Sequence, residues 1–103
     1  MSVVVVATVY PMAEHRDEVV RAMVQAIERV HAEDEGCELY ALHEGQDRLV
    51  MIEKWASAEA LGAHGQSPAL AELQPLIADK VVGEFDVQVL HPHPAGMDEQ
   101  GAL

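Results

Sequence analysis

Histidines are the side chains best suited to acid–base or metal chemistry in this chain of 103 residues, which has six of them and one cysteine. His91 and His93 flank a proline and could hold a metal between them, but two ligands make a weak site, so we expect no resident metal. His43 lies on a predicted strand among apolar residues, which fits a hydrogen-bonded interior histidine. Cys37 has no base positioned near it, so we expect a small apolar residue rather than a nucleophile.

Charge and composition exclude several classes of protein. The chain has 6 Lys and Arg against 18 Asp and Glu, a net charge of -12, so we exclude nucleic acids and anionic membranes as partners. The seven glycines form neither a G-x-G-x-x-G motif nor a P-loop, so we expect neither of these nucleotide-binding sites. The N-terminus lacks the basic region of a signal peptide, and no apolar run is long enough to span a membrane. We therefore expect a cytoplasmic protein.

Hydrophobic periodicity predicts one domain of four strands and three helices. The expected strands are residues 3–10, 38–44, 49–55 and 84–90. The first helix should start near Glu14 and end at a left-handed C-cap, Gly36. Its buried stripe should contain Val20, Met23, Val24, Ile27 and Val30 or His31. A short helix should follow the cap Ser57, and another should start at Ser67-Pro68 with a kink or early end at Pro75. Residues 2–91 form the predicted domain, and residues 92–103 a flexible tail.

The order strand–helix–strand–strand–helix–strand predicts an α+β, ferredoxin-like (split βαβ) fold with a four-stranded antiparallel sheet. Its helices can cover only one face of that sheet. The other face carries several Val and Leu side chains, which would leave a larger apolar patch than monomers usually expose. We therefore predict a homodimer that buries this open sheet face between two copies.

The stretch V-M-I-E-K-W-A-S at residues 50–57, followed by Leu61 and by H-G-Q-S-P at residues 64–68, resembles the signature of antibiotic biosynthesis monooxygenase domains. That signature is a strand ending in E-x-W, a short helix, and then L-x-x-H-x-x-[ST]-P. Glu35-Gly36-Cys37 is also similar to an E-x-G-C segment of the family. The resemblance covers roughly residues 3 to 91 and is greatest to the small quinol monooxygenase-like members, which form dimeric α/β barrels.

The resemblance implies a cofactor-independent monooxygenase that oxidises a small aromatic, phenolic or quinol substrate with O₂. An electron-rich aromatic can itself reduce O₂ once it is deprotonated, so the protein need supply only a dry pocket, a base and stabilisation of the anion. His64 is the expected catalytic base or anion stabiliser. Trp55, Glu53, His43 and Tyr40 are the expected substrate-binding residues, with Trp55 as a flat wall and N–H donor. A capping role for His64 beside Ser67, and a purely structural role for Trp55, are the alternatives.

The chain departs from two branches of the family. The anthrone oxygenases have an Asn where this chain has Met51, a Tyr where it has Leu61, and a later Arg, whereas no Arg follows Arg48 here. The haem-degrading relatives have an Asn and a haem-ligating His at the positions of Val9 and Gln74. These differences argue against haem degradation and against that particular set of oxygenase groups.

Two other functions stay open at the level of sequence. One is an isomerase or other acid–base enzyme that acts on a small carbonyl compound, which oxygen consumption would distinguish from a monooxygenase. The other is a non-catalytic dimer that binds a small apolar ligand, which saturable binding without product would indicate. Fold analogy alone does not choose among the three functions.

Overall fold

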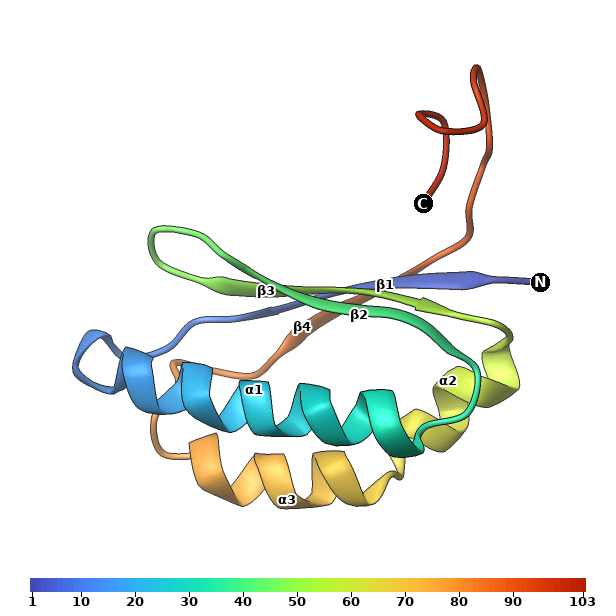
Figure 1. The fold of residues 1–103 in the computed structure, drawn as a ribbon. Helices are drawn as coiled ribbons and strands as arrows, with labels where there is room; N and C mark the ends of the chain where they lie inside the picture. The colour runs from blue at the N-terminus through green and yellow to red at the C-terminus, as the bar shows by residue number, and fades with distance from the viewer.

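The computed structural model describes all 103 residues and contains one four-stranded antiparallel sheet with its helices on a single face (Figure 1). In chain order the elements are β1 (Val3–Val9), the 3-10 turn η1 (Ala13–His15), α1 (Arg16–Glu33), β2 (Cys37–Glu44), β3 (Leu49–Trp55), α2 (Ala58–Gly65), α3 (Pro68–Ile77) and β4 (Asp86–Leu90). The strands lie in the order β2-β3-β1-β4. This topology confirms the predicted ferredoxin-like α+β fold.

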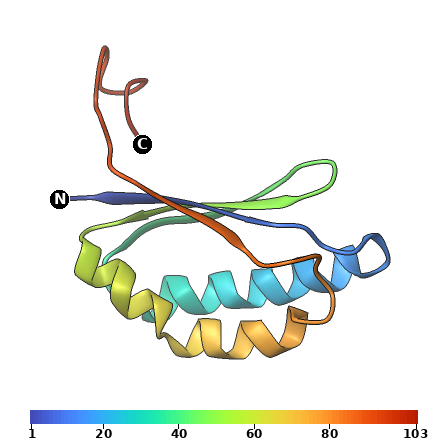
Figure 2. The same cartoon turned by 180° about the vertical axis from the view of Figure 1, so that it is seen from behind.

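The two faces of the sheet have different surroundings. On β1, Val3, Val5 and Val9 are buried against the helices, while Val4 and Val6 point to the other face and are only half-buried. The views from front and back agree that α1, α2 and α3 all lie on one side of the sheet (Figures 1 and 2). The core therefore lies between the sheet and the helices, and the opposite face has no helix over it.

The buried stripe of α1 agrees with the predicted one at Met23 and Val30 and differs from it elsewhere. Val19, Met23, Ala26 and Val30 are buried, at the 4-3-4 spacing of one helix face, whereas the predicted core residue Val24 is 43% exposed. The helix carries two adjacent apolar rows, so its hydrophobicity alone does not decide which row faces the sheet. Packing against the sheet and α3 selects the row that contains Val19.

The elements near the C-terminus also differ in their bounds from the prediction. Helix α3 continues for two residues past Pro75, because the buried Ile77 anchors its last turn in the core. Strand β4 begins at Asp86, two residues later than predicted, and pairs only with β1. The segment after Leu90 contains no helix or strand and rises from the sheet on the side away from the helices (Figure 2). Its flexibility stays a prediction.

No helix has the length and apolar character needed to cross a lipid bilayer.

Gly36 shapes the connection between α1 and β2, although not as the predicted C-cap. The helix is capped by Asp34, and Gly36 follows two residues later with φ 80° in a tight turn. Its carbonyl accepts a hydrogen bond from Ala56 N at 2.8 Å. A Cβ at Gly36 would lie 2.6 Å from the Cβ of Ala60 in α2. The turn therefore depends on glycine both for its positive φ and for its close approach to α2.

We expect Gly36→Ala to lower the free energy of unfolding by roughly 1–3 kcal/mol, because it combines a left-handed backbone with a steric overlap. Urea denaturation followed by circular dichroism would measure the loss. Gly62→Ala is the matched control, since Gly62 lies within α2 with no atom near the added methyl group. That variant should gain up to about 1 kcal/mol from helix propensity. Equal stabilities of the two variants would contradict the prediction.

Candidate functional site

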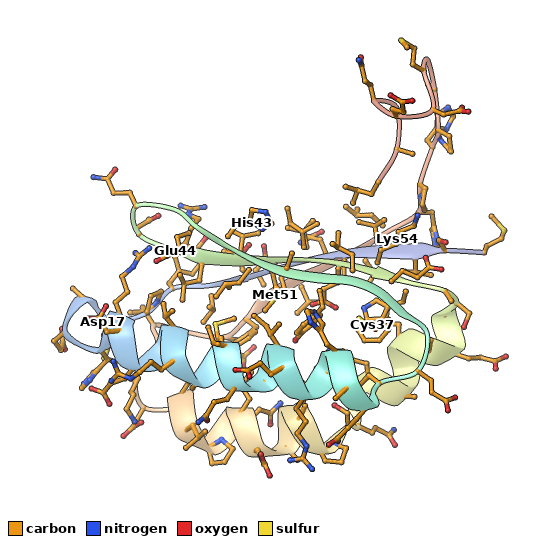
Figure 3. All side chains as sticks on the ribbon, in the orientation of Figure 1. Asp17, Cys37, His43, Glu44, Met51 and Lys54 are labelled. Atoms are coloured by element: carbon orange, nitrogen blue, oxygen red, sulfur yellow. The ribbon has the colours of Figure 1, made fainter.

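A cavity of about 730 Å³ lies between the helix-covered face of the sheet and the helices. Hydrophobic residues make up 13 of the 19 that line it. Met51 is one of them, and its side chain points from β3 towards the helices (Figure 3). The polar groups of the lining are the hydroxyl of Tyr40 and the side chains of Glu53, His64, Gln74 and Glu84. The space suits an apolar molecule that has a few polar groups.

His64 enters the cavity wall from the last turn of α2. Ser57 starts this helix by accepting a hydrogen bond from Ala60 N at 3.1 Å, and the helix brings His64 under the end of β3. The side chain of His64 is only 6% exposed, and its Nδ1 lies 2.7 Å from Oδ2 of Asp34. The capping role beside Ser67 belongs instead to the Ser67 hydroxyl, which accepts a hydrogen bond from Leu70 N.

Asp34 holds His64 from behind the cavity. Its side chain is 8% exposed and does not line the cavity. The carboxylate can only accept a hydrogen bond, so Nδ1 of His64 carries the proton between them. The second ring nitrogen, Nε2, is then the one with a lone pair for a molecule in the cavity. A buried carboxylate that orients an imidazole in this way fixes its tautomer and stabilises the imidazolium that forms when the ring takes a proton.

Two aromatic rings fix the plane of the His64 ring. The centroid of Trp55 lies 4.4 Å from that of His64, with an angle of 32° between the ring planes. Tyr40 meets His64 edge to face at 5.1 Å. Trp55 is completely buried, and Tyr40 is 5% exposed. The imidazole is therefore held by packing as well as by its bond to Asp34.

Glu53 is a buried carboxylate beside this cluster. It is 4% exposed, and its Oε1 accepts a hydrogen bond from Trp55 Nε1 at 2.9 Å. Burial raises the pKa of Glu53, and the bond from Trp55 and the nearby His64 partly oppose the rise. Burial, followed by the charges of Glu53 and Asp34, also raises the pKa of Tyr40. The Tyr40 hydroxyl therefore stays protonated and can donate a hydrogen bond in the cavity.

The structure brings together four of the five predicted site residues, but not all of them reach the cavity. His64, Tyr40 and Glu53 line it. Trp55 lies behind them and gives its N–H to Glu53, so it presents neither a wall nor a donor to a bound molecule. His43 lies on the open face of the sheet, exposed, with Nδ1 3.2 Å from the carbonyl of Ala41 (Figure 3). It is outside the cavity because it points away from the helices.

Asp34 is the member of the site that the sequence analysis missed. A signal for it was present in the E-x-G-C resemblance. Counted back from Cys37, the acidic position of that pattern falls on Asp34 and not on Glu35, which is exposed. Cys37 itself lies half-buried at the start of β2, where burial and then the charge of Asp34 raise the pKa of its thiol. A thiol of this kind is a poor nucleophile.

The fold and the cavity define a class of protein: a ferredoxin-like α+β domain that encloses an apolar site with an Asp–His pair. The family model for antibiotic biosynthesis monooxygenase matches residues 2–76, so the chain belongs to that family. No curated protein matches the chain.

Solved structures share the fold. Rv0793 from Mycobacterium tuberculosis superposes with a TM-score of 0.85 at 24% identity, over 94% of this chain and 100% of the other. A protein from Caulobacter crescentus CB15, provisionally named an antibiotic biosynthesis monooxygenase, gives a TM-score of 0.82 at 22% identity, over 86% of this chain and 87% of the other. PA3566 from Pseudomonas aeruginosa superposes with a TM-score of 0.78 at 18% identity, over 87% of this chain and 92% of the other. At these identities the likeness supports the fold alone.

Proposed function

We propose that this protein is a monooxygenase that oxidises a small phenolic or quinol substrate with O₂ and without a resident cofactor. The observation that carries the proposal is the Asp34–His64 pair at the wall of an apolar cavity, in which Nδ1 of His64 is bonded to Asp34 and Nε2 has no hydrogen-bond partner within the protein. Membership of the monooxygenase family adds the reaction class. Glu53 and Tyr40 supply an acceptor and a donor that can orient the hydroxyl groups of the substrate.

The proposed reaction requires the protein to accept one proton from the substrate. Nε2 of His64 takes the proton of a substrate hydroxyl, and Asp34 stabilises the resulting imidazolium. The substrate anion then reduces O₂, one oxygen atom enters the ring, and the other leaves as water. The balance closes without an added reductant, because a hydroquinone and O₂ together give a hydroxyquinone and water. The mostly hydrophobic lining reduces the contact between the anion and water.

Oxygen uptake tests the proposal. Purified metal-free protein should consume O₂ above the rate of autoxidation with at least one member of a panel of hydroquinones, naphthoquinols and anthrones. His64→Ala should abolish this excess, whereas His93→Ala, in the exposed segment after β4, should leave it unchanged. Mass spectrometry should find one added oxygen atom in the product. Equal uptake by the His64→Ala variant, with its fold intact, would remove His64 from the mechanism.

The same pair of side chains also favours one other reaction. The imidazole of His64, which lines the cavity, can move a proton between two carbons of a carbonyl compound without O₂, as an isomerase does, while Asp34 behind it stabilises the imidazolium. An absence of oxygen uptake across the panel, combined with exchange of an α-proton of a bound ketone in D₂O, would favour this second function.

We also propose that the protein works as a homodimer joined through the open sheet face. The support is the row of apolar side chains that no helix covers, which includes Val6 of β1 and its cross-strand partner Ile52 of β3. Ile52→Asp should give a monomer in analytical ultracentrifugation, because it places a charge at the centre of the proposed interface. Val24→Asp, on the outer surface of α1, is the control and should leave the mass unchanged. A wild-type monomer would refute the dimer.

A further inference from the structure

The cavity has an unusual distribution of charge. Its lining contains two carboxylates, Glu53 and Glu84, and one imidazole, but no Lys or Arg. Asp34 adds a third carboxylate directly behind His64. Many small metabolites carry a carboxylate or a phosphate, and proteins that bind them usually place a cation or a cluster of backbone N–H groups at the site. This cavity offers no such cation.

The basic residues of the chain are engaged or directed elsewhere. Arg16 bonds to the carbonyl groups of the β2–β3 turn, and Arg29 pairs with Glu33 and Glu72 on the outer side of α1. Arg21 is exposed. Arg48 pairs with Asp47, and Lys80 pairs with Asp79. Lys54 donates a hydrogen bond to the carbonyl of Leu103. None of the six lines the cavity, so none is placed to neutralise an anionic ligand there.

We propose that the cavity admits uncharged or cationic apolar molecules and rejects acids, and that Glu53 is the residue that sets this selection. Glu53 is buried, has one hydrogen-bond donor, Trp55, and forms no ion pair with a Lys or an Arg. A ligand carboxylate beside it would bring two like charges together next to a side chain that is only 4% exposed, where water screens them weakly. A hydroxyl or an ammonium group would instead donate a hydrogen bond to Glu53 or to Nε2 of His64.

The inference rests on the proposed function only in taking this cavity as the substrate site. It narrows the substrates to neutral phenols, quinols and ketones or to aromatic amines, and it excludes aromatic acids, phosphate esters and coenzyme A thioesters. Binding can be measured without turnover. The selection against anionic ligands can therefore hold even if the protein does not oxygenate the ligands it binds, and oxygenation can occur even if the cavity does not select against anions.

Three naphthalenes of nearly equal size test the selection by isothermal titration calorimetry at neutral pH. They are 2-naphthol, which is neutral, 2-naphthoate, which is an anion, and 2-naphthylmethylammonium, which is a cation. Wild-type protein should bind the anion at least about tenfold more weakly than the other two. Equal affinity for 2-naphthol and 2-naphthoate would overturn the proposal, and so would a failure to bind any of the three.

Glu53→Gln assigns the selection to one side chain. The amide keeps the size of the carboxylate and can still accept the Trp55 N–H, so the cavity should keep its shape. The affinities of the Glu53→Gln protein for 2-naphthol and 2-naphthoate should differ by no more than about threefold. Its affinity for 2-naphthylmethylammonium should be about tenfold lower than that of the wild type. Glu59→Gln, on the exposed side of α2, should behave as wild type. If the ratio of the affinities for 2-naphthol and 2-naphthoate were the same in the Glu53→Gln protein as in the wild type, the role of Glu53 would be refuted.

Discussion

Replacement of Asp34 by asparagine should lower turnover of an accepted substrate by about 10²–10⁴-fold, the usual contribution of a general base. The amide has the shape of the carboxylate but no charge, and its NH₂ group can donate to Nδ1 of His64. The imidazole then adopts the other tautomer and presents an N–H, rather than a lone pair, to the cavity. Steady-state oxygen consumption by the Asp34→Asn protein would measure the effect.

The kinetic pattern distinguishes a positioning role from a structural one. Asp34 does not line the cavity, so the loss should fall on kcat while KM stays within about twofold of the wild-type value. Asp34→Glu should recover part of kcat, because it restores the negative charge. The neighbouring exposed residue supplies the control, and Glu35→Gln should leave both constants unchanged. A loss confined to KM, or an equal loss in the control, would show that Asp34 does not act through His64.

The backbone of this fold could be predicted from local sequence patterns. The period of two along a strand requires Val5 and Val6 of β1 to lie on opposite sides of the sheet, and the structure places them there. Ser57 and Ser67-Pro68 marked the starts of α2 and α3 correctly. These features depend on neighbours within a few residues, and this explains why sequence reasoning reached them.

The site depends on contacts that no local pattern encodes. Asp34 and His64 are 30 positions apart, and they meet only because the turn at Gly36 brings the end of α1 against α2. The place of Trp55 behind the cavity rather than in its wall follows from its bond to Glu53, which is likewise visible only in three dimensions.

The position of His43 could have been predicted from the sequence. Tyr40 and His43 are three positions apart on one strand, so their side chains must point to opposite faces. Both could not contact the same pocket. The burial of Tyr40 assigns it to the helix-covered face and leaves His43 on the other.

Trp55→Ala should be the most destabilising single substitution in the chain. Removal of a fully buried tryptophan costs about 3–5 kcal/mol, and the loss of its N–H leaves the Glu53 carboxylate without a donor, which adds about 1–3 kcal/mol. Domains of this size have an unfolding free energy of about 5–15 kcal/mol, so the substitution should remove a large part of the stability of the fold. Trp55 is the only tryptophan, so urea unfolding should be followed by far-ultraviolet circular dichroism rather than by fluorescence.

Two further variants separate the two contributions. Trp55→Phe keeps most of the ring volume and removes the N–H, so it should lose about 1–3 kcal/mol more than its cavity term alone. Pairing it with Glu53→Gln should recover part of this loss, because a neutral amide tolerates a missing donor better than a buried carboxylate does. Val82→Ala, at a side chain that is 61% exposed, should stay within about 0.5 kcal/mol of wild type. Strict additivity of the Trp55→Phe and Glu53→Gln effects would show that the indole N–H contributes nothing to holding Glu53.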